Sequence, residues 1–273
     1  MRLTNYDIHP MLSGYVEKLW VYETDKALPQ SDLHIIVPNG LVKVVIPFKN
    51  GLRAQMQGKE KVSSTHEITL IGIADIPSVV SEVKDEPSGT IGIEFSPAGA
   101  YRFFSLSLQD ITNCVLPLSD LMGKTARALE EQIANTESVQ DKVVSVQRFL
   151  CSQFAIHHRD EIFEYCIGKI IGSGGRIQVA DLERQTGYSS RWLNMKFHTR
   201  IGISPKNLST IVRFQEIYRS WAQTNFTNFS GADVYSFYHD QAHFIKDFKR
   251  FTGFSPSKYQ LQENDFGKIF YKD

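Results

Sequence analysis

The chain of 273 residues has few cysteines, no long apolar run and no net charge. Its three cysteines, Cys114, Cys151 and Cys166, include no C-x-x-C pair, and an odd number is typical of a reducing compartment. No run approaches the ~18 apolar residues of a membrane span, and the N-terminal sequence MRLTNYDIHP has no apolar signal region. We therefore expect a cytoplasmic protein without a membrane partner, whose cysteines are small buried hydrophobes.

Motifs that hold phosphates, metals or catalytic groups are also missing. The glycine-rich residues 172–175 lack the Lys-Ser/Thr ending of a phosphate loop, and there is no H-E-x-x-H. The histidines are too scattered for a metal site, and the adjacent His157 and His158 point in different directions on a helix. Glu94 and Arg102 can meet an effector or an anion, but a salt-bridged glutamate and a structural ion pair are simpler interpretations. We expect no enzyme activity, no cofactor and no metal.

The zero net charge conceals an uneven distribution. Residues 176–258 contain 12 Lys/Arg and 6 Asp/Glu, whereas the rest of the chain contains 18 and 24. A basic module joined to an acidic one is typical of a DNA-binding protein with a separate sensor or partner domain. The length suits two domains, which we assign to residues 1–155 and 156–273. Binding to DNA should then be sensitive to salt.

Residues 238–259, YHDQAHFIKDFKRFTGFSPSKY, predict a recognition helix followed by a fixed stop. Asp240 is a suitable N-cap, and Gly253 suits the left-handed position at which a helix ends. An aromatic face opposite a face with Gln and Lys is the form of helix that a major groove accepts. By itself the stretch would equally suit an ordinary amphipathic surface helix. The aromatic face consists of Phe244, Phe248 and Phe251.

A second copy of this frame lies upstream, in residues 188–208, YSSRWLNMKFHTRIGISPKNL. The shared frame is an apolar residue, three variable residues, Phe, four more, and then Gly-x-Ser-Pro. A repeat with constant offset is a strong sign of organisation. Gly187 precedes the copy as a plausible helix-turn-helix corner. The matched pairs are Leu193 and Phe244, Phe197 and Phe248, Gly202 and Gly253, Ser204 and Ser255, and Pro205 and Pro256.

With these two units, the chain resembles the DNA-binding domain of the AraC/XylS transcription regulators over roughly residues 160–260. The segment DQAHFIKDFKRFTGFSPSKY is similar to that family's signature. The resemblance implies one long helix between the units, here residues 205–222. It implies two recognition helices, at about residues 189–201 and 240–252. These would enter successive major-groove segments roughly 34 Å apart.

Carried over by position, the resemblance also implies which side chains contact DNA. Arg191 can bond bidentately to guanine, and Asn194 and Gln241 can do so to adenine. Other basic residues suit phosphates, which give affinity and register without sequence information. The base-contact candidates are Ser190, Arg191, Asn194 and Met195 in the first unit and Gln241, Ala242, Ile245 and Lys246 in the second; the phosphate-contact candidates are Lys196, Lys249 and Arg250.

Three residues depart from the family pattern. Asp233, in the expected helix 231–237, and Glu183 stand where small residues are usual. Phe237 replaces the usual turn glycine, where a positive φ would be awkward for a bulky residue. We therefore expect irregular scaffolding helices in both units.

The N-terminal part predicts β structure. Short β-branched stretches with turns between them, including Pro38-Asn39-Gly40, are typical of an antiparallel barrel or sandwich. The stretches VPNGLVKVVIPF, IGIEFSPAGAYRFFSLSLQDITN and LPLSDLMG resemble the N-terminal domain of one AraC-type subgroup. That resemblance implies a β-rich, often cupin-like domain that binds small effectors or mediates dimerisation. Strands are expected within 34–48, 67–74, 79–83 and 89–95, a strand or entry segment at 9–22, a loop or hairpin edge at 53–61, and helices at 98–104, 116–122, 124–135, 139–154, 160–171 and 177–186.

The predicted fold class is α+β, with an N-terminal β-rich domain followed by an all-α domain of two helix-turn-helix units. The favoured function is sequence-specific DNA binding in transcription regulation, with double-stranded DNA as partner. A small-molecule effector or a homodimer partner would act through the N-terminal domain. Two alternatives stay open. One is an enzyme built on the β domain with a DNA-binding appendage. The other is a protein-interaction module whose helix-turn-helix units have degenerated.

Overall fold

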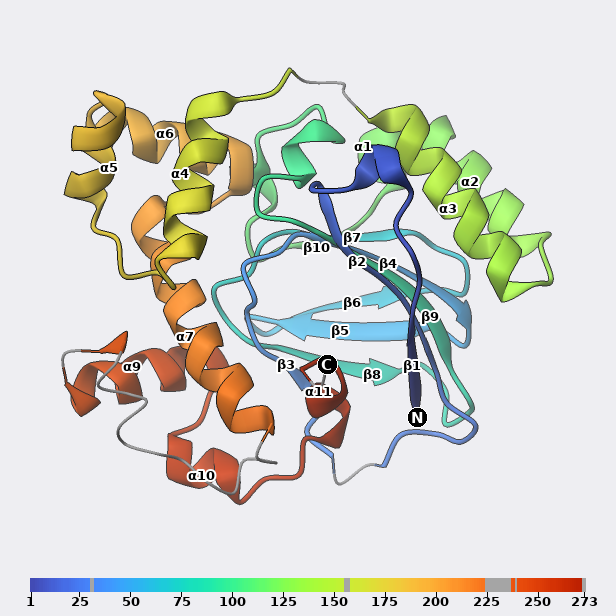
Figure 1. Cartoon of the computed structure of the whole chain (residues 1–273). Coiled ribbons are helices and arrows are strands. Elements are labelled where there is room, and N and C mark those ends of the chain that lie inside the picture. The colour runs from blue at the N-terminus through green and yellow to red at the C-terminus, as the bar shows by residue number, and fades with distance from the viewer. Residues whose placement is uncertain (30–31, 155–157, 224–236, 239, 272–273) are drawn as a thin grey trace.

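The computed structural model of the chain describes residues 1–29, 32–154, 158–223, 237–238 and 240–271. Two antiparallel β-sheets fill the N-terminal half, and most of the helices of the C-terminal half lie beside them (Figure 1). The predicted α+β class is therefore confirmed. The domain boundary predicted between residues 155 and 156 falls outside the described residues.

The described strands form a sheet of six and a sheet of four, and every strand pair is antiparallel. The larger sheet has the order β1 (Arg2–Asn5), β2 (Val16–Glu23), β9 (Gly89–Phe95), β4 (Lys43–Lys49), β7 (Thr69–Ile71) and β10 (Val115–Pro117). The smaller sheet has the order β3 (Ile35–Ile36), β8 (Ser78–Glu82), β5 (Leu52–Met56) and β6 (Lys59–Ser63).

Alternation along β2 divides the interior into two parts. Leu19 and Val21 enter the large core, whereas Trp20 and Tyr22 enter a smaller apolar cluster on the other face. This follows from the two-residue period of a strand. Opposite Trp20 stands Gly92, and a Cβ there would lie 2.0 Å from the indole Cζ2. Only glycine leaves room for the indole to lie against β9.

Most strand predictions are confirmed, with three differences. The turn at Pro38-Asn39-Gly40 does not close a hairpin, because β3 and β4 belong to different sheets. The predicted helix 116–122 begins instead as β10, which pairs with β7, and only Ser119–Met122 forms helix α1. The predicted helix 98–104 is a single 3₁₀ turn, Ala100–Arg102. Pairing partners and core contacts distant in sequence decide these three segments.

The helices from α2 to α9 were predicted closely because their ends are coded locally, whereas α10 and α11 were not predicted. Along the described chain the helices are α2 (Lys124–Ala134), α3 (Val139–Gln153), α4 (Glu161–Gly172), α5 (Val179–Thr186), α6 (Ser190–Ile201), α7 (Pro205–Gln223), α9 (Gln241–Thr252), α10 (Pro256–Gln260) and α11 (Asp265–Ile269). Of the expected helix 231–237, residues 231–236, including Asp233, lie outside the described residues. The last of these helices, α11, returns to the sheets beside β3 (Figure 1).

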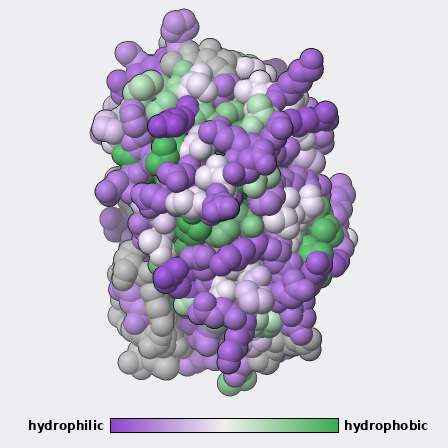
Figure 2. Space-filling model, turned by 90° about the vertical axis from the view of Figure 1, so that its right-hand side faces the viewer, coloured by the Kyte–Doolittle hydropathy of each residue, from purple (hydrophilic) through white to green (hydrophobic). Residues whose placement is uncertain are grey.

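The face turned to the viewer in Figure 2 carries α2 and α3, and two helices packed on a β domain are a common dimer surface. This face is mostly hydrophilic, with small separate apolar areas. The apolar side of α2 is buried instead, through Ala126, Leu129 and Ile133. Dimerisation through these helices remains a hypothesis.

Candidate nucleic-acid interface

Helix α6 has a capping residue at each end. The Ser189 hydroxyl accepts from the N–H of Trp192 at 3.3 Å, and Gly202 ends the helix with a φ of 99°. Its inner face, Leu193, Phe197 and Ile201, is buried. The opposite face is therefore held toward solvent in a fixed rotation.

The preceding helix α5 is continuous, in contrast to the irregular scaffold that we expected from Glu183. Gly187 makes the corner with a φ of 75°. The carboxylate of Glu183 accepts a hydrogen bond from the backbone N–H of Ser190, in the first turn of α6. A free N–H at a helix start is a favourable partner for a carboxylate, so this glutamate joins the two helices of the unit.

Helix α9 has the same construction. Asp240 caps it by accepting from the N–H of His243 at 2.7 Å, and Gly253 ends it with a φ of 82°. Its rings Phe244, Phe248 and Phe251 are buried, and Phe248 and Phe251 pack on aromatic side chains of α7 and α10. These caps and this buried face agree with the sequence prediction.

Phe237 does not have the positive φ that its place in the family pattern would require. It is helical and half-buried, and the guanidinium of Arg176 lies over its ring at 5.4 Å from the centroid. A Cβ on Gly174 would lie 3.2 Å from the same ring. Packing against the turn after α4 thus accounts for a phenylalanine at this position.

The base-contact candidates differ in how freely they face solvent. Asn194 donates its side-chain amide to the carbonyl of Ser190 at 2.8 Å, within its own helix. That bond uses one of the two groups needed for a bidentate contact to adenine. The exposed candidates are Arg191, Met195, Gln241, Ala242, Ile245 and Lys246, and the half-buried ones are Ser190 and Asn194.

Lys196, a phosphate candidate on α6, is held by a neighbouring helix. Its ammonium lies 2.9 Å from the carboxylate of Asp160 and over the ring of Trp192. Arg200 approaches the same carboxylate at 3.3 Å. Burial alone would raise the pKa of Asp160. The hydrogen bonds and these two cations together lower it by more, so the pKa lies below its usual range. The charge of Lys196 is thus partly neutralised.

Arg250, a phosphate candidate on α9, is held by the N-terminal half. Its guanidinium pairs with Asp75, in the loop after β7, and donates to the side chain of Asn207 at 3.1 Å. Asn113 and Asn207 each donate to Asp75 at 2.8 Å. Burial raises the pKa of Asp75, but these bonds and the charge of Arg250 lower it below its usual range. The sequence gives no signal for this contact, because its partners are 175 residues apart. Lys249, the remaining phosphate candidate, is exposed.

Helix α6 leads into the N-terminal end of the long helix α7, and helix α9 packs along α7 through Phe214 and Trp221 (Figure 1). Helix α7 has 19 residues, Pro205–Gln223, as the resemblance implied. Its buried side chains include Phe214, which packs on both Phe248 and Phe251 of α9. The two candidate recognition helices are therefore fixed to one rigid element.

The isolated polar groups of the N-terminal half have structural partners. Glu94 is buried and pairs with Lys43 at 3.3 Å, which confirms the salt-bridged interpretation. For Arg102 the expected ion pair is wrong within the described residues. Arg102 donates to the hydroxyl of Tyr15 at 2.9 Å and lies over the rings of Tyr15 and Phe154. His158 is described, whereas His157 lies outside the described residues.

The described residues were compared with the requirements of a metal site and of a membrane-spanning helix. No group of three or more metal-binding side chains is found there. None of the helices described combines the length and the apolar composition that a membrane span requires. The cysteines are free thiols, of which Cys166 is buried; the prediction of buried cysteines is wrong for Cys114 and Cys151, which are half-buried.

Comparison with known proteins gives matches to two separate parts of the chain. Residues 182–262 match a family model described as "Helix-turn-helix domain", and residues 5–117 match a "Domain of unknown function (DUF6597)". A search of the curated proteins finds no match. Among solved structures, ToxT from Vibrio cholerae (P21 form) is 14% identical, with a TM-score of 0.48 over 90% of this chain and 98% of that chain.

Two further solved structures are similar to this chain. ToxT from Vibrio cholerae O395 bound to (E)-4-(8-methylnaphthalen-1-yl)but-3-enoic acid is 16% identical, with a TM-score of 0.49 over 90% of this chain and 98% of that chain. A Cupin_2 domain of an XRE family transcriptional regulator from Enterobacter cloacae is 11% identical, with a TM-score of 0.28 over 35% of this chain and 97% of that domain.

Proposed function

We propose, on the premise that the chain carries an AraC-type helix-turn-helix domain at its C-terminus, that it is a sequence-specific DNA-binding transcription regulator. Domains of this type bind duplex DNA by inserting the second helix of each unit into the major groove. In the proposal, residues 156–273 bind DNA, and residues 1–155 respond to an effector or mediate dimerisation.

The observation that carries the proposal is the pair of capped helices α6 and α9 on one long helix. The 19 residues of α7 span about 28 Å at a rise of about 1.5 Å per residue. Successive major-groove segments on one face of DNA are roughly 34 Å apart, and two helices carried by one rigid element can be held for adjacent segments. Both recognition helices can then enter the same face of one duplex.

Exposed side chains of the right chemistry support the assignment of base contacts. Arg191 suits guanine, Gln241 suits adenine, and Lys246 suits guanine or a phosphate. Met195 and Ile245, 58% and 38% exposed, are large apolar side chains facing solvent. In the groove they would gain apolar contacts, for example with thymine methyl groups.

The proposal is tested by selecting binding sites from random duplex DNA with the purified full-length protein. We expect a bipartite site with elements about 10 bp apart. Arg191→Ala and Lys246→Ala should each reduce affinity for that site by about 1–3 kcal/mol, which is roughly 5- to 150-fold. Lys124→Ala, an exposed change on α2, is the charge-matched control and should leave affinity unchanged.

Other outcomes would favour the alternatives. Equal affinity of the wild type and both variants for the selected site, across a range of salt, would overturn the base-contact assignment. A flat titration with any DNA at low salt would favour a protein-interaction module with degenerate units. Catalytic turnover of a small molecule by the full chain would favour a β-domain enzyme.

A further inference from the structure

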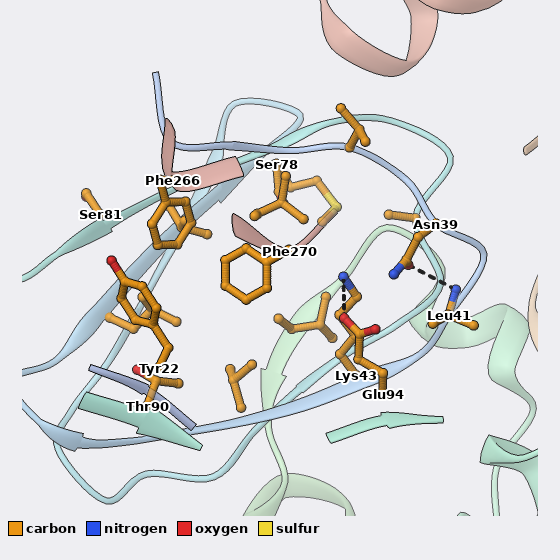
Figure 3. Close-up of a pocket in the computed structure, with 18 of the residues that line it drawn as sticks. Tyr22, Asn39, Leu41, Lys43, Ser78, Ser81, Thr90, Glu94, Phe266 and Phe270 are labelled. Atoms are coloured by element: carbon orange, nitrogen blue, oxygen red, sulfur yellow. Dashed lines mark hydrogen bonds and ion pairs between the residues drawn. The ribbon is translucent and has the colours of Figure 1, made fainter. Parts of the chain in front are cut away.

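A pocket lies between the two sheets, on the face of β2 that carries Trp20 and Tyr22. Its empty space, including the part open to solvent, is about 1000 Å³. The wall is mostly aliphatic and aromatic, with polar groups at a few places (Figure 3). A largely apolar cleft with a few fixed polar groups is the usual form of a small-molecule site.

The C-terminal segment supplies part of this wall. Phe266 packs edge-on against Tyr22 with ring centroids 5.3 Å apart, and Phe270 packs against Trp20 at 5.1 Å. Figure 3 shows the Phe270 ring between Tyr22 on one side and the Lys43–Glu94 pair on the other. Two rings that follow the second helix-turn-helix unit in sequence thus lie within the N-terminal sheets.

Specific hydrogen bonds hold the segment there. The side chain of Asn264 accepts from the N–H of Ile35 and donates to its carbonyl, both at 3.0 Å. The N–H of Phe266 donates to Asp32 at 2.8 Å, and the hydroxyl of Tyr271 donates to the carbonyl of Val37 at 3.0 Å. The segment is therefore docked in one defined position beside the pocket.

Two hydrogen-bond donors of the pocket are left for a molecule inside it. Trp20 and Tyr22 are 6% and 4% exposed, and both line the pocket. Among the described residues, neither the indole Nε1 nor the phenol oxygen has a hydrogen-bond partner. Buried polar groups without partners are unfavourable, so an acceptor atom within reach of either group would be stabilising.

The charges of the pocket do not favour an anion. Lys43 is its cation, and Glu94 already neutralises it at 3.3 Å (Figure 3). A second carboxyl, Glu82, lines the same pocket and accepts from the N–H of Leu28. Burial raises the pKa of Glu82, which indicates that the pocket disfavours charged groups.

We infer that this pocket binds a small, uncharged, ring-bearing molecule with a hydrogen-bond acceptor, and that Phe266 and Phe270 are part of the site. The acceptor bonds to the hydroxyl of Tyr22, and the rings of the ligand pack against the four aromatic side chains. Because the ligand contacts the docked C-terminal segment, it binds the docked state more tightly and stabilises it. The inference rests on the proposed function only in identifying the ligand as an effector.

The test is a titration of the full-length protein with prodan, an uncharged naphthalene fluorophore that carries a ketone. Saturable binding with a blue-shifted emission is expected. Anilinonaphthalene sulfonate, an anion of similar size, should bind at least about tenfold more weakly. Tighter binding of the sulfonate, or no saturable binding of prodan, would overturn the inference.

Variants test which side chains form the site. Tyr22→Phe, which removes only the hydroxyl, should weaken prodan binding about fivefold. Tyr165→Phe removes an exposed hydroxyl outside the pocket and should have no effect. Phe270→Ala should weaken binding about tenfold, whereas Leu261→Ala, at a side chain 83% exposed, should not. Unchanged binding by Tyr22→Phe and folded Phe270→Ala would overturn the site. If Phe270→Ala does not fold, Tyr22→Phe decides.

Hydrogen exchange tests the coupling to the C-terminal segment. Prodan should slow exchange of the backbone amides of residues 263–271, and exchange unaffected by bound prodan would contradict a role for this segment. These measurements contain no DNA. A failure to select a DNA site would therefore overturn the proposed function without affecting this result.

Discussion

The two helix-turn-helix units share one sequence frame but contact the N-terminal half in different ways. The C-terminal end of α6 is packed into it: the carbonyl of Gly202 accepts from the hydroxyl of Thr112 at 2.8 Å, and α6 contacts the 3₁₀ turn Leu108–Ile111. Helix α9 reaches it through the ion pair of Arg250 with Asp75. The first unit is thus fixed by packing, whereas the contact of α9 is polar; in the proposed function, DNA phosphates would compete with Asp75 for Arg250.

The largest expected difference in stability is between substitutions of the two matched glycines, Gly202 and Gly253. A Cβ on Gly202 would lie 2.8 Å from the carbonyl of Leu108, whereas a Cβ on Gly253 would meet nothing within 4 Å. Both have a positive φ, of 99° and 82°. We expect Gly202→Ala to lower the free energy of unfolding by about 3 kcal/mol and Gly253→Ala by about 1 kcal/mol. Urea denaturation measures both, and equal losses would contradict the difference in packing.

The next largest change in stability concerns the N-terminal ends of the two candidate recognition helices. Glu183→Ala removes the carboxylate that accepts from Ser190, which should cost about 1–2 kcal/mol of stability. Glu183→Gln keeps an acceptor and should cost less. Asp240→Ala, at the cap of α9, is the matched change in the second unit and should cost about 1 kcal/mol. A Glu183→Ala variant as stable as the wild type would show that α6 does not depend on this cap.

These ends are also where the sequence was most informative. Caps, the repeated Gly-x-Ser-Pro frame and the spaced phenylalanines are local signals, and they predicted α6, α7 and α9 closely. The contact of Asp75 with Arg250 and the insertion of Phe270 into the sheets join residues distant in the chain. No local pattern encodes such pairs. The strand β10 was missed for the same reason, since pairing with β7 decides it.

A smaller effect should appear in DNA binding by the second unit. Asp75→Asn removes the charge that holds Arg250 and should raise affinity for the selected site about threefold at low salt. Asp85→Asn makes the same change in net charge at an exposed position and serves as the control. If both variants bind DNA equally, the contact between Asp75 and Arg250 does not restrain α9.

The smallest expected effect is a pH dependence of the stability that Asp75 contributes. The pKa of Asp75 is lowered in the folded protein, so its contribution to stability is complete above its unfolded pKa of about 3.9. The contribution is lost as the pH falls through the lowered folded pKa. The stability difference between wild type and Asp75→Asn should be constant from about pH 7 to about pH 5 and shrink below about pH 4. Urea denaturation at each pH measures it, and a difference that grows in acid would contradict the lowered pKa.

The amide of Asn264 has a further consequence for the sheet beside it. Strand β3 is the first in the order of the four-stranded sheet, and Asn264 bonds to both backbone groups of Ile35 as a neighbouring strand would. Unpaired strand edges are templates for aggregation, and proteins cover them. In this chain one asparagine side chain covers the edge. A chain shortened before Asn264 would therefore expose a site for self-association.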